Sequence, residues 1–460
     1  MEYDVIVVGG GAAGLMAAVV AAGRGKRILL LEKMDQCGRK LRITGKGRCN
    51  LTNTNPLRDT LPHIGSSTAG TTKKPGQTGG VWLRNAYGRF FNRELMDFFE
   101  SRGVELTVER GNRVYPASGK ALDIFLALIG ELEQNPNVTI RKNATVKSVG
   151  TRRAVSEASY STTADAARHV PTEATCVILQ GGERIPCRHI ILATGGLSYP
   201  TTGSTGAGHL MASELGHTVI EAVPSLVALR CKEQIPEELV GFQLKNVQLS
   251  LFSSSPKLGE GDRREAVVEE CVFRSGIGEM TFTEDGLGGP IVLSASRIAS
   301  RPLHEGQPLT ARLDFKPGLT HEQLDRRLQA DLNANGTRIF NDALRLWLPA
   351  ELIPLALKQL HIEYYKRLHQ ITGEERRRLR DWLKGATFTL TGTRDWNEAI
   401  VTQGGVSLSE VNPKTMESRL VSGLYIIGEL LDLDADTGGY NLQIAFSTAH
   451  AAAEAVYITD

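Results

Sequence analysis

Three glycines near the N-terminus have the spacing of a turn that binds a dinucleotide. Gly9, Gly11 and Gly14 follow the apolar run YDVIVV and precede the Ala-rich segment LMAAVVAAGRG. In this arrangement the first glycine permits a tight turn and the second lets a pyrophosphate approach the backbone, while the third lets a helix pack closely on the strand. The helix N-terminus adds unpaired N–H groups and a positive dipole. The segment therefore predicts binding of a nucleotide diphosphate.

An acidic residue follows at the distance that such a site requires. Glu32 ends a second apolar run, Arg27–Leu31, about 20 residues beyond the first glycine. A carboxylate there can accept the hydroxyls of the adenosine ribose, and it disfavours a 2′-phosphate. FAD or NAD therefore fits better than NADP. The alternative is a glycine-rich turn in an ordinary strand–helix–strand unit.

The next segment, CGRKLRITGKGRCNLTN, favours FAD over NAD. It is a Gly-rich, turn-forming stretch whose basic side chains are Arg39, Lys40, Arg42, Lys46 and Arg48. Such a loop can lie along a diphosphate and a flavin ring, with basic side chains and backbone donors facing oxygen atoms. A solvated basic loop is the alternative interpretation.

The C-terminal end repeats this logic. A strand expected over Leu424–Ile427 reaches Gly428 and Glu429, and two further glycines, Gly438 and Gly439, precede an Ala-rich helix expected from about Leu442. Glu429 can accept hydroxyls of a ribityl chain. A helix N-terminus can stabilise negative charge on the pyrimidine edge of a reduced flavin. Both ends of the chain are therefore expected to bind one FAD.

Two strands from the middle of the chain are expected at the same site. The run HIILATGG is an apolar strand that ends against the cofactor in Thr194, Gly195 and Gly196, and ATVKSV brings Val146 beside the adenine. The side chains expected near the reactive face are Arg48, Asn50 and Tyr440, beside the backbone of Gln403–Gly405. Tyr440 can donate a proton, with a packing role as the alternative. The thiol of Cys49 has either a lowered pKa beside Arg48 or a buried structural role.

No competing chemistry is indicated. There is no Ser-His-Asp order, paired-carboxylate signature or metal-ligand cluster, so no metal site is expected. The cysteines form no CxxC pair, which argues against zinc, an iron–sulfur cluster or a redox dithiol and suits a reducing cytoplasm. A second GxGxxG is also missing. Reduced nicotinamide, NAD(P)H, would therefore visit the site transiently, or the substrate itself would reduce the flavin.

Length and composition set the broader expectations. A chain of 460 residues is too long for one hydrophobic core. No apolar run approaches the roughly 20 residues of a membrane span, the acidic N-terminus is unlike a signal peptide, and a net charge of +2 argues against a nucleic-acid partner. Short β-like runs are expected from Pro200 to about Gly318 and helices over Thr320–Lys384. The arginine-rich run Glu374–Arg380 is expected to be a solvated helix face, with a nucleic-acid or partner patch as the alternative.

Five motifs together resemble one known family. The motifs GRKxxxTGKGRCNLTN, SYPTTGSTG, VTQGGV, TMESRLVSGLYIIGELLD and TGGYNLQIA occur in this order. They resemble bacterial NAD(P)/FAD-dependent oxidoreductases of the aminoacetone-oxidase-like and bile-acid-reductase-like kind, which are related to the fumarate reductase and glutathione reductase group of FAD folds. The resemblance covers nearly the whole chain. It departs at Ala207 and His209, where the family usually has Asp and Tyr, and in the stretches 58–80 and 152–175, which are expected to be mobile surface loops.

The resemblance implies an α/β architecture with a discontinuous Rossmann-like FAD-binding domain. It places that domain at 1–199 and 394–460, a β-rich inserted domain at 200–318 and 386–393, and a small helical domain within the insertion at 319–385. It also implies non-covalent FAD contacts. With those expected from the residues themselves, the contacts are Gly9, Gly11, Ala12, Ala13, Gly14, Glu32, Lys33, Arg39, Lys40, Arg48, Cys49, Asn50, Val146, Ala193, Thr194, Gly195, Gly196, Gly405, Gly428, Glu429, Gly439, Tyr440, Asn441 and Leu442.

Three functions follow from these expectations. The first is a cytoplasmic flavin reductase that takes hydride from NAD(P)H and reduces an unsaturated or carbonyl-containing small molecule. The second is an oxidase or dehydrogenase of an amine or amino-ketone. The third, from a different class, is an FAD-containing RNA-modifying or nucleic-acid-binding protein that uses the arginine-rich helix.

Overall fold

The chain folds into two compact units. The structure is a computed structural model, and it describes residues 3–67, 78–153, 172–256 and 267–456. Residues Met1–Val223 and Ile400–Asp460 form the first unit, and Pro224–Ala399 form the second. Each unit has its own cluster of buried apolar side chains. The two ends of the chain therefore share one hydrophobic core.

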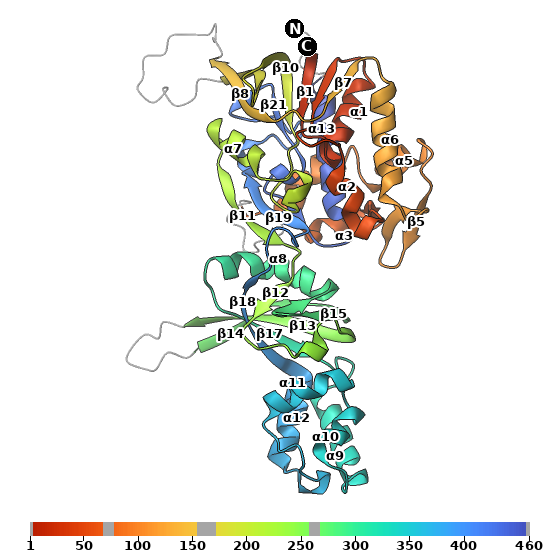
Figure 1. The fold of residues 1–460 in the computed structure, drawn as a ribbon, viewed down its shortest axis with the longest axis vertical. Helices are drawn as coiled ribbons and strands as arrows, with labels where there is room; N and C mark the ends of the chain where they lie inside the picture. The colour runs from red at the N-terminus through yellow and green to blue at the C-terminus, as the bar shows by residue number, and fades with distance from the viewer. Residues whose placement is uncertain (1–2, 68–77, 154–171, 257–266, 457–460) are drawn as a thin grey trace. The chain divides into compact units, whose positions relative to one another are not determined.

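The first unit is built on a mainly parallel sheet (Figure 1). At its centre β1 (Tyr3–Val8) lies between β2 (Ile28–Leu31) and β10 (Arg184–Leu192), and both neighbours run parallel to it. The parallel order continues through β7 (Val138–Arg141) beside β2 and β21 (Leu424–Ile426) beside β10. Antiparallel β9 (Thr172–Leu179) and β8 (Val146–Arg153) complete that side. Such a Rossmann-type arrangement brings the carboxyl ends of the parallel strands to one edge.

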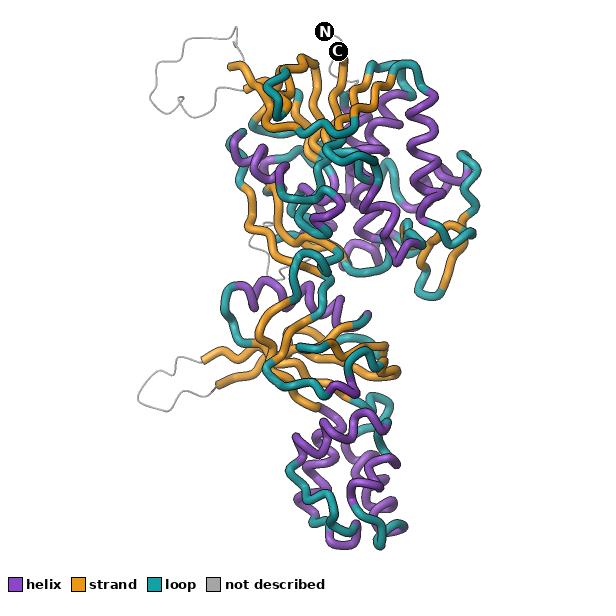
Figure 2. The backbone as a smooth tube through the Cα atoms, viewed as in Figure 1, coloured by secondary structure: helices purple, strands orange, loops and turns teal. Residues whose placement is uncertain are grey.

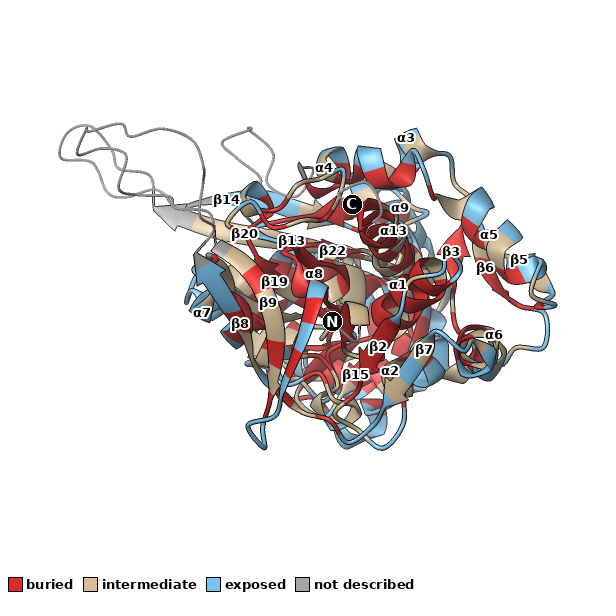
Figure 3. Ribbon diagram, turned by 90° about the horizontal axis from the view of Figure 1, so that it is seen from above, coloured by how far each residue is buried: buried red, intermediate tan, exposed pale blue. Residues whose placement is uncertain are grey.

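Two small-residue helices join the chain ends. Helix α1 (Ala12–Ala22) packs against α13 (Tyr440–Ala455), and most of both helices is buried (Figure 3). Their alanines allow this close approach, because a larger side chain would hold the two helix axes further apart. The other helices of this unit are α2 (Arg39–Ile43), α3 (Leu57–Thr60), α4 (Thr78–Tyr87), α5 (Asn92–Glu100), α6 (Ala121–Gln134) and α7 (Ala207–Glu214).

Short strand pairs connect distant segments of the first unit. Strand β4 (Ile64–Gly65) pairs with β22 (Asp434–Ala435), and β11 (Val219–Ser225) pairs with β19 (Val401–Val406). A three-stranded sheet contains β3 (Thr52–Asn53), β6 (Arg113–Pro116) and β5 (Leu106–Glu109). These pairs hold the loops that follow the glycine turns.

The second unit has a strand-rich part and a helical part (Figure 2). Its antiparallel sheet comprises β12 (Leu229–Cys231), β13 (Gln243–Pro256), β14 (Val267–Arg274), β15 (Gly278–Thr283), β16 (Gly286–Gly288), β17 (Leu309–Asp314) and β18 (Ala386–Thr393), with α8 (Pro290–His304) packed on it. The helical part comprises α9 (His321–Ala334), α10 (Phe340–Ala343), α11 (Ile353–Leu360) and α12 (Gly373–Gly385). The expected strands of the insertion and its helices over Thr320–Lys384 are confirmed.

Parts of two expected loops fall outside the described residues, at 68–77 and 154–171. The described flanks of the first contain α3, β4 and the start of α4, and those of the second lie in β8 and β9. Along the described ranges, no helix is both long enough and apolar enough to cross a bilayer.

Candidate functional site

The glycine turn has the geometry that the sequence predicts. Gly9 has φ +104°, and a Cβ added to it would lie 2.6 Å from the carbonyl oxygen of Ala193. A Cβ on Gly14 would lie 1.8 Å from the oxygen of Gly9, so no side chain fits between the helix and the turn. A Cβ on Gly11 would meet nothing within 4 Å. The turn is therefore closed at Gly9 and Gly14 and open at Gly11, where a phosphate would approach.

Glu32 fixes the same turn. It lies at the end of β2 with 9% of its surface exposed. One carboxylate oxygen accepts from the backbone N–H of Gly10 at 2.8 Å, and the other accepts from Met34 N–H at 2.8 Å. An ionised carboxylate has further lone pairs. Glu32 can therefore bind the turn and a ribose hydroxyl together.

A polar network brings four distant segments together. The Nζ of Lys40 donates to Oε2 of Glu429 at 2.6 Å, and the hydroxyl of Ser198 donates to Oε1 at 2.6 Å. The backbone N–H of Thr402 also donates to Oε1, at 2.8 Å. The Thr402 hydroxyl in turn accepts from the N–H of Leu197 at 2.8 Å. The sequence predicts Lys40 and Glu429 here but missed Ser198 and Thr402, which are single polar residues in motifs noticed only for their glycines.

The network holds Glu429 as a carboxylate. Burial alone would raise the pKa of Glu429, but the Lys40 ammonium and the donors from Ser198 and Thr402 lower that pKa below its ordinary value. Glu429 is therefore an acceptor at neutral pH, suited to hydroxyl groups of a ligand.

The basic loop, residues 37–53, contacts the start of α13. A Cβ on Gly439 would lie 2.4 Å from the carbonyl oxygen of Thr52. With its amide in the orientation that satisfies both neighbours, Asn50 accepts from the N–H of Gly439 at 3.0 Å and donates to Thr52 O at 3.2 Å. The expected convergence of this loop with the C-terminal helix is thus present.

Tyr440 is the first residue of α13 and is 4% exposed. Its hydroxyl accepts from the side-chain amide of Asn55 at 2.9 Å. Burial raises the pKa of Tyr440, and Asp436 adds to this, while the Asn55 hydrogen bond and Arg113 oppose it. The phenol therefore stays protonated at neutral pH and retains a proton to donate.

Arg48 and Cys49 lie in different surroundings. Arg48 forms an ion pair with Glu109, and its guanidinium lies 4.5 Å from the ring centre of Tyr115. Cys49 is fully buried with φ +58°, and burial raises the pKa of its thiol to about 12. A thiol with that pKa is inert at neutral pH, which favours the structural interpretation of Cys49.

The acidic loop before α13 is held from both sides. The Asn441 side chain accepts from the N–H of Ala435 at 2.9 Å and donates to the Ala435 carbonyl at 2.9 Å. On the other side, the Nδ1 of His63 lies 2.8 Å from Oδ2 of Asp436. The His63 ring stacks on Tyr440, with ring centres 4.7 Å apart. Neither His63 nor Asp436 was expected from the sequence.

The remaining predicted contacts lie around these groups. Lys33 donates to the Thr205 hydroxyl at 2.7 Å, whereas Arg39 pairs outward with Asp35. A Cβ on Gly196 would overlap Thr402, and one on Gly428 would lie 2.9 Å from Ala13. The other predicted residues lie at or near element boundaries: Ala12 begins α1, Val146 begins β8, Ala193 and Gly195 follow β10, Gly405 lies in β19, and Leu442 lies in the first turn of α13.

The open side of Gly11 and the acceptor carboxylates suit a bound FAD. A Cβ on Gly11 would meet nothing within 4 Å, so a phosphate can approach the backbone there. Glu32 and Glu429 supply acceptor oxygens for hydroxyl groups. The residues present therefore fit the cofactor.

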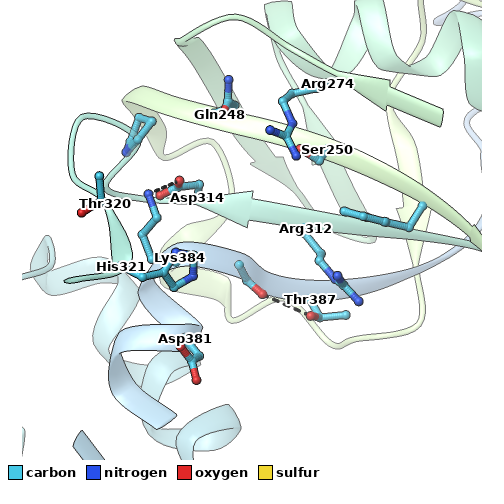
Figure 4. A pocket seen from close by; sticks show the side chains of 13 residues that line it. Gln248, Ser250, Arg274, Arg312, Asp314, Thr320, His321, Asp381, Lys384 and Thr387 are labelled. Carbon is cyan, nitrogen blue, oxygen red and sulfur yellow. Dashed lines mark hydrogen bonds and ion pairs between the residues drawn. The ribbon is translucent and has the colours of Figure 1, made fainter. Parts of the chain in front are cut away.

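The second unit has a separate polar pocket of about 740 Å³ (Figure 4). Its charged groups are largely paired with one another. Lys384 forms an ion pair with Asp314 at 2.6 Å, and Arg312 pairs with Glu269 while stacking 4.2 Å from the Phe252 ring centre. This pairing gives the pocket no clear preference for an anion or a cation.

Comparison with known proteins gives four similarities. A family model described as HI0933-like protein Rossmann domain matches residues 3–455. The chain is 30% identical over 451 residues to the 3-dehydro-bile acid delta(4,6)-reductase of Clostridium scindens, and 28% identical over 457 residues to the ribosomal RNA dihydrouridine synthase of Escherichia coli (strain K12), with 98% of each chain covered. A solved 3-ketosteroid-delta4-(5alpha)-dehydrogenase from Rhodococcus jostii RHA1 aligns with TM-score 0.45 at 14% identity, over 99% of this chain and 96% of that one.

Proposed function

This chain belongs to the HI0933-like Rossmann-domain family, and from that membership we propose that it reduces a carbon–carbon double bond conjugated to a carbonyl group in a small organic molecule. It is an FAD-dependent oxidoreductase with a Rossmann-type FAD-binding fold. The reductase direction is supported by the named activity of the Clostridium scindens relative.

The observation that carries the proposal is the network of Lys40, Ser198, Thr402 and Glu429. It joins four segments at the edge where the parallel strands end. We propose that this edge binds FAD, with the pyrophosphate at Gly11, the adenosine ribose at Glu32 and the ribityl hydroxyls at Glu429. When bound and reduced, FAD would supply a hydride to the acceptor. The protein residues would hold the acceptor and supply the proton.

We further propose NAD(P)H as a transient electron donor. The sequence contains no second GxGxxG motif that would hold a nicotinamide permanently. The donor and the acceptor would then use the same cleft in turn.

An anaerobic titration tests this proposal. The purified protein should be yellow, and NADH or NADPH should bleach it within seconds. A 3-oxo-4,6-diene bile acid should then restore the colour. A yellow protein that neither nucleotide bleaches would contradict the donor assignment and favour an amine or amino-ketone oxidase. A colourless protein that FAD cannot reconstitute would contradict the cofactor site.

A second candidate is reduction of uridine in RNA, favoured by the Escherichia coli relative. The double bond of uracil is also conjugated to a carbonyl, so the same proton and hydride chemistry applies. Arg377 and Arg378 on α12 are exposed, whereas Arg376 and Arg380 pair with Asp325. Reoxidation of the reduced protein by ribosomal RNA but not by the bile acid would select this candidate.

A further inference from the structure

His63 and Asp436 are joined by two hydrogen bonds across the β4–β22 pair. The backbone N–H of Asp436 donates to the carbonyl of His63 at 3.0 Å, and the carboxylate of Asp436 meets Nδ1 at 2.8 Å. With the carboxylate on Nδ1, a neutral His63 presents Nε2 as an acceptor and a protonated His63 presents it as a donor. Nε2 has no hydrogen-bond partner within the described ranges. The imidazole is therefore fixed in orientation and able to exchange one proton at a known atom.

The pair lies directly beside the helix start assigned to the flavin. The ring of His63 is 4.7 Å from that of Tyr440 and nearly parallel to it, at 12°. Tyr440 follows Gly439, whose N–H reaches Asn50 of the basic loop. The side chains of His63 and Asp436 are 38% and 28% exposed. Solvent can therefore replace a proton that His63 gives up.

We propose that His63 is the proton donor of the reduction and that Asp436 is its positioning residue. This rests on the proposed reductase function. The Nε2–H bond of the imidazolium breaks, and a C–H bond forms at the carbon next to the acceptor's carbonyl. The other hydrogen arrives at the far carbon of the double bond with its electron pair, as the hydride that reduced FAD supplies. His63 is left neutral with its proton on Nδ1, hydrogen-bonded to Asp436, and solvent restores the proton on Nε2.

Three groups face the imidazole or its neighbour. Asp436 faces His63 from the loop before α13, Tyr440 faces it from α13, and Arg113 on β6 acts on Tyr440. Removing the carboxylate of Asp436 takes away the group that fixes the orientation of the imidazole through Nδ1. A D436N protein should therefore transfer the proton more slowly than wild type.

The test separates the two half-reactions of FAD-loaded protein. In H63Q, FAD affinity and the rate of flavin reduction by NADPH or dithionite should stay within about threefold of wild type. Reoxidation by the 3-oxo-4,6-diene bile acid should slow by about 10²–10⁴-fold and lose its dependence on an ionisation. D436N should show a smaller loss, because the imidazole is still present but is no longer held by the carboxylate. H369Q is the matched control, since His369 is exposed and its Nδ1 meets only the carbonyl of Gly336, at 2.8 Å.

Two outcomes would overturn the proposal. One is an H63Q protein whose reoxidation keeps the wild-type rate and pH profile. The other is found by NMR without any substrate: an imidazole signal of His63 that does not move on FAD binding would show that the pair is not at the cofactor. If the wild-type protein reduces no enone but the His63 signal responds to FAD, the proposed function fails while the location of the donor stands.

Discussion

Gly11 and Gly14 lie three residues apart, but an added methyl group would meet different surroundings at each. At Gly14 it would overlap the carbonyl of Gly9, at 1.8 Å. G14A should therefore lower the free energy of unfolding of the apo protein by about 1–3 kcal/mol or more. Urea denaturation followed by circular dichroism measures this loss.

At Gly11 the methyl group would meet no protein atom within 4 Å. G11A should leave apo stability within about 0.5 kcal/mol of wild type. It should weaken FAD binding about tenfold or more, because the methyl group occupies the proposed approach of the pyrophosphate. A G11A protein with wild-type FAD affinity would contradict the placement of the phosphate at this glycine.

Lys40 and Glu429 depend on each other. Each side chain is 21% exposed, and K40M would leave the carboxylate without its cation. The cost should be about 3 kcal/mol, at the low end for a broken buried pair because some water reaches it. The double variant K40M/E429Q should recover most of that loss, since no uncompensated charge remains. A loss in the double variant equal to the sum of the two single losses would show that the pair is not coupled.

The same carboxyl group predicts a pH dependence of stability. The pKa of Glu429 in the folded protein is below its ordinary value of 4.5. Its contribution is therefore fully present above about pH 4.5 and is lost as the pH falls through the folded pKa. The stability of E429Q should fall less steeply below pH 4.5 than that of wild type. Identical slopes in urea titrations would contradict this role.

At the scale of elements, the loop from Leu431 to Gly439 depends on Asn441. One side chain makes hydrogen bonds to both the N–H and the carbonyl of Ala435 and to the carbonyl of Asp436. N441A should make opening of this loop easier by about 1–3 kcal/mol. Amide hydrogen exchange at Ala435 and Asp436 should accelerate about tenfold or more.

The control for this prediction is N341A. Asn341 is half-buried on α10, and its side-chain amide reaches only Asp342. Exchange in the loop should be unchanged in this variant. If N441A also left exchange unchanged, the β4–β22 pair alone would be sufficient to hold the loop.

The sequence predicts an element well when the residues that determine it are close together in the chain. The turn at Gly9, the strands around it and the helices of the insertion follow from spacing and periodicity within a few residues. His63 and Asp436 are 373 positions apart and meet through a two-residue pair that has no periodicity to detect. Ser198 and Thr402 show the same limit, because their roles arise only when separate loops meet. Arg48 contacts Glu109 and Tyr115, which lie on the hairpin of β5 and β6. No sequence motif connects that hairpin with Arg48.

At the scale of the whole molecule, the two units have separate cores. All the proposed FAD contacts lie in the first unit, which is interrupted by Pro224–Ala399. The inserted segment begins at the end of β11 and ends just before β19, and these two strands pair with each other. They lie so close that a Cβ on Gly404 would touch the carbonyl of Glu221. A chain in which a short Gly/Ser linker replaces Pro224–Ala399 should therefore fold and bind FAD.

The visible spectrum and an FAD titration of this shortened chain check the prediction. A folded but colourless protein would show that residues of the second unit are needed for the cofactor. Retained FAD is the expected result, because all the proposed FAD contacts lie in the first unit.

The packing of α1 against α13 has a consequence for biosynthesis. The apolar strand Tyr3–Val8 and helix α1 leave the ribosome long before their partner helix, which ends at Ala455. At roughly 5–20 residues per second, the nascent chain waits roughly 20–90 s before it can bury them. The inserted unit, contiguous in sequence, can fold during that interval. Chaperones that shield exposed apolar segments should therefore associate with the β1–α1 segment of the nascent chain and release it only after α13 has been synthesised.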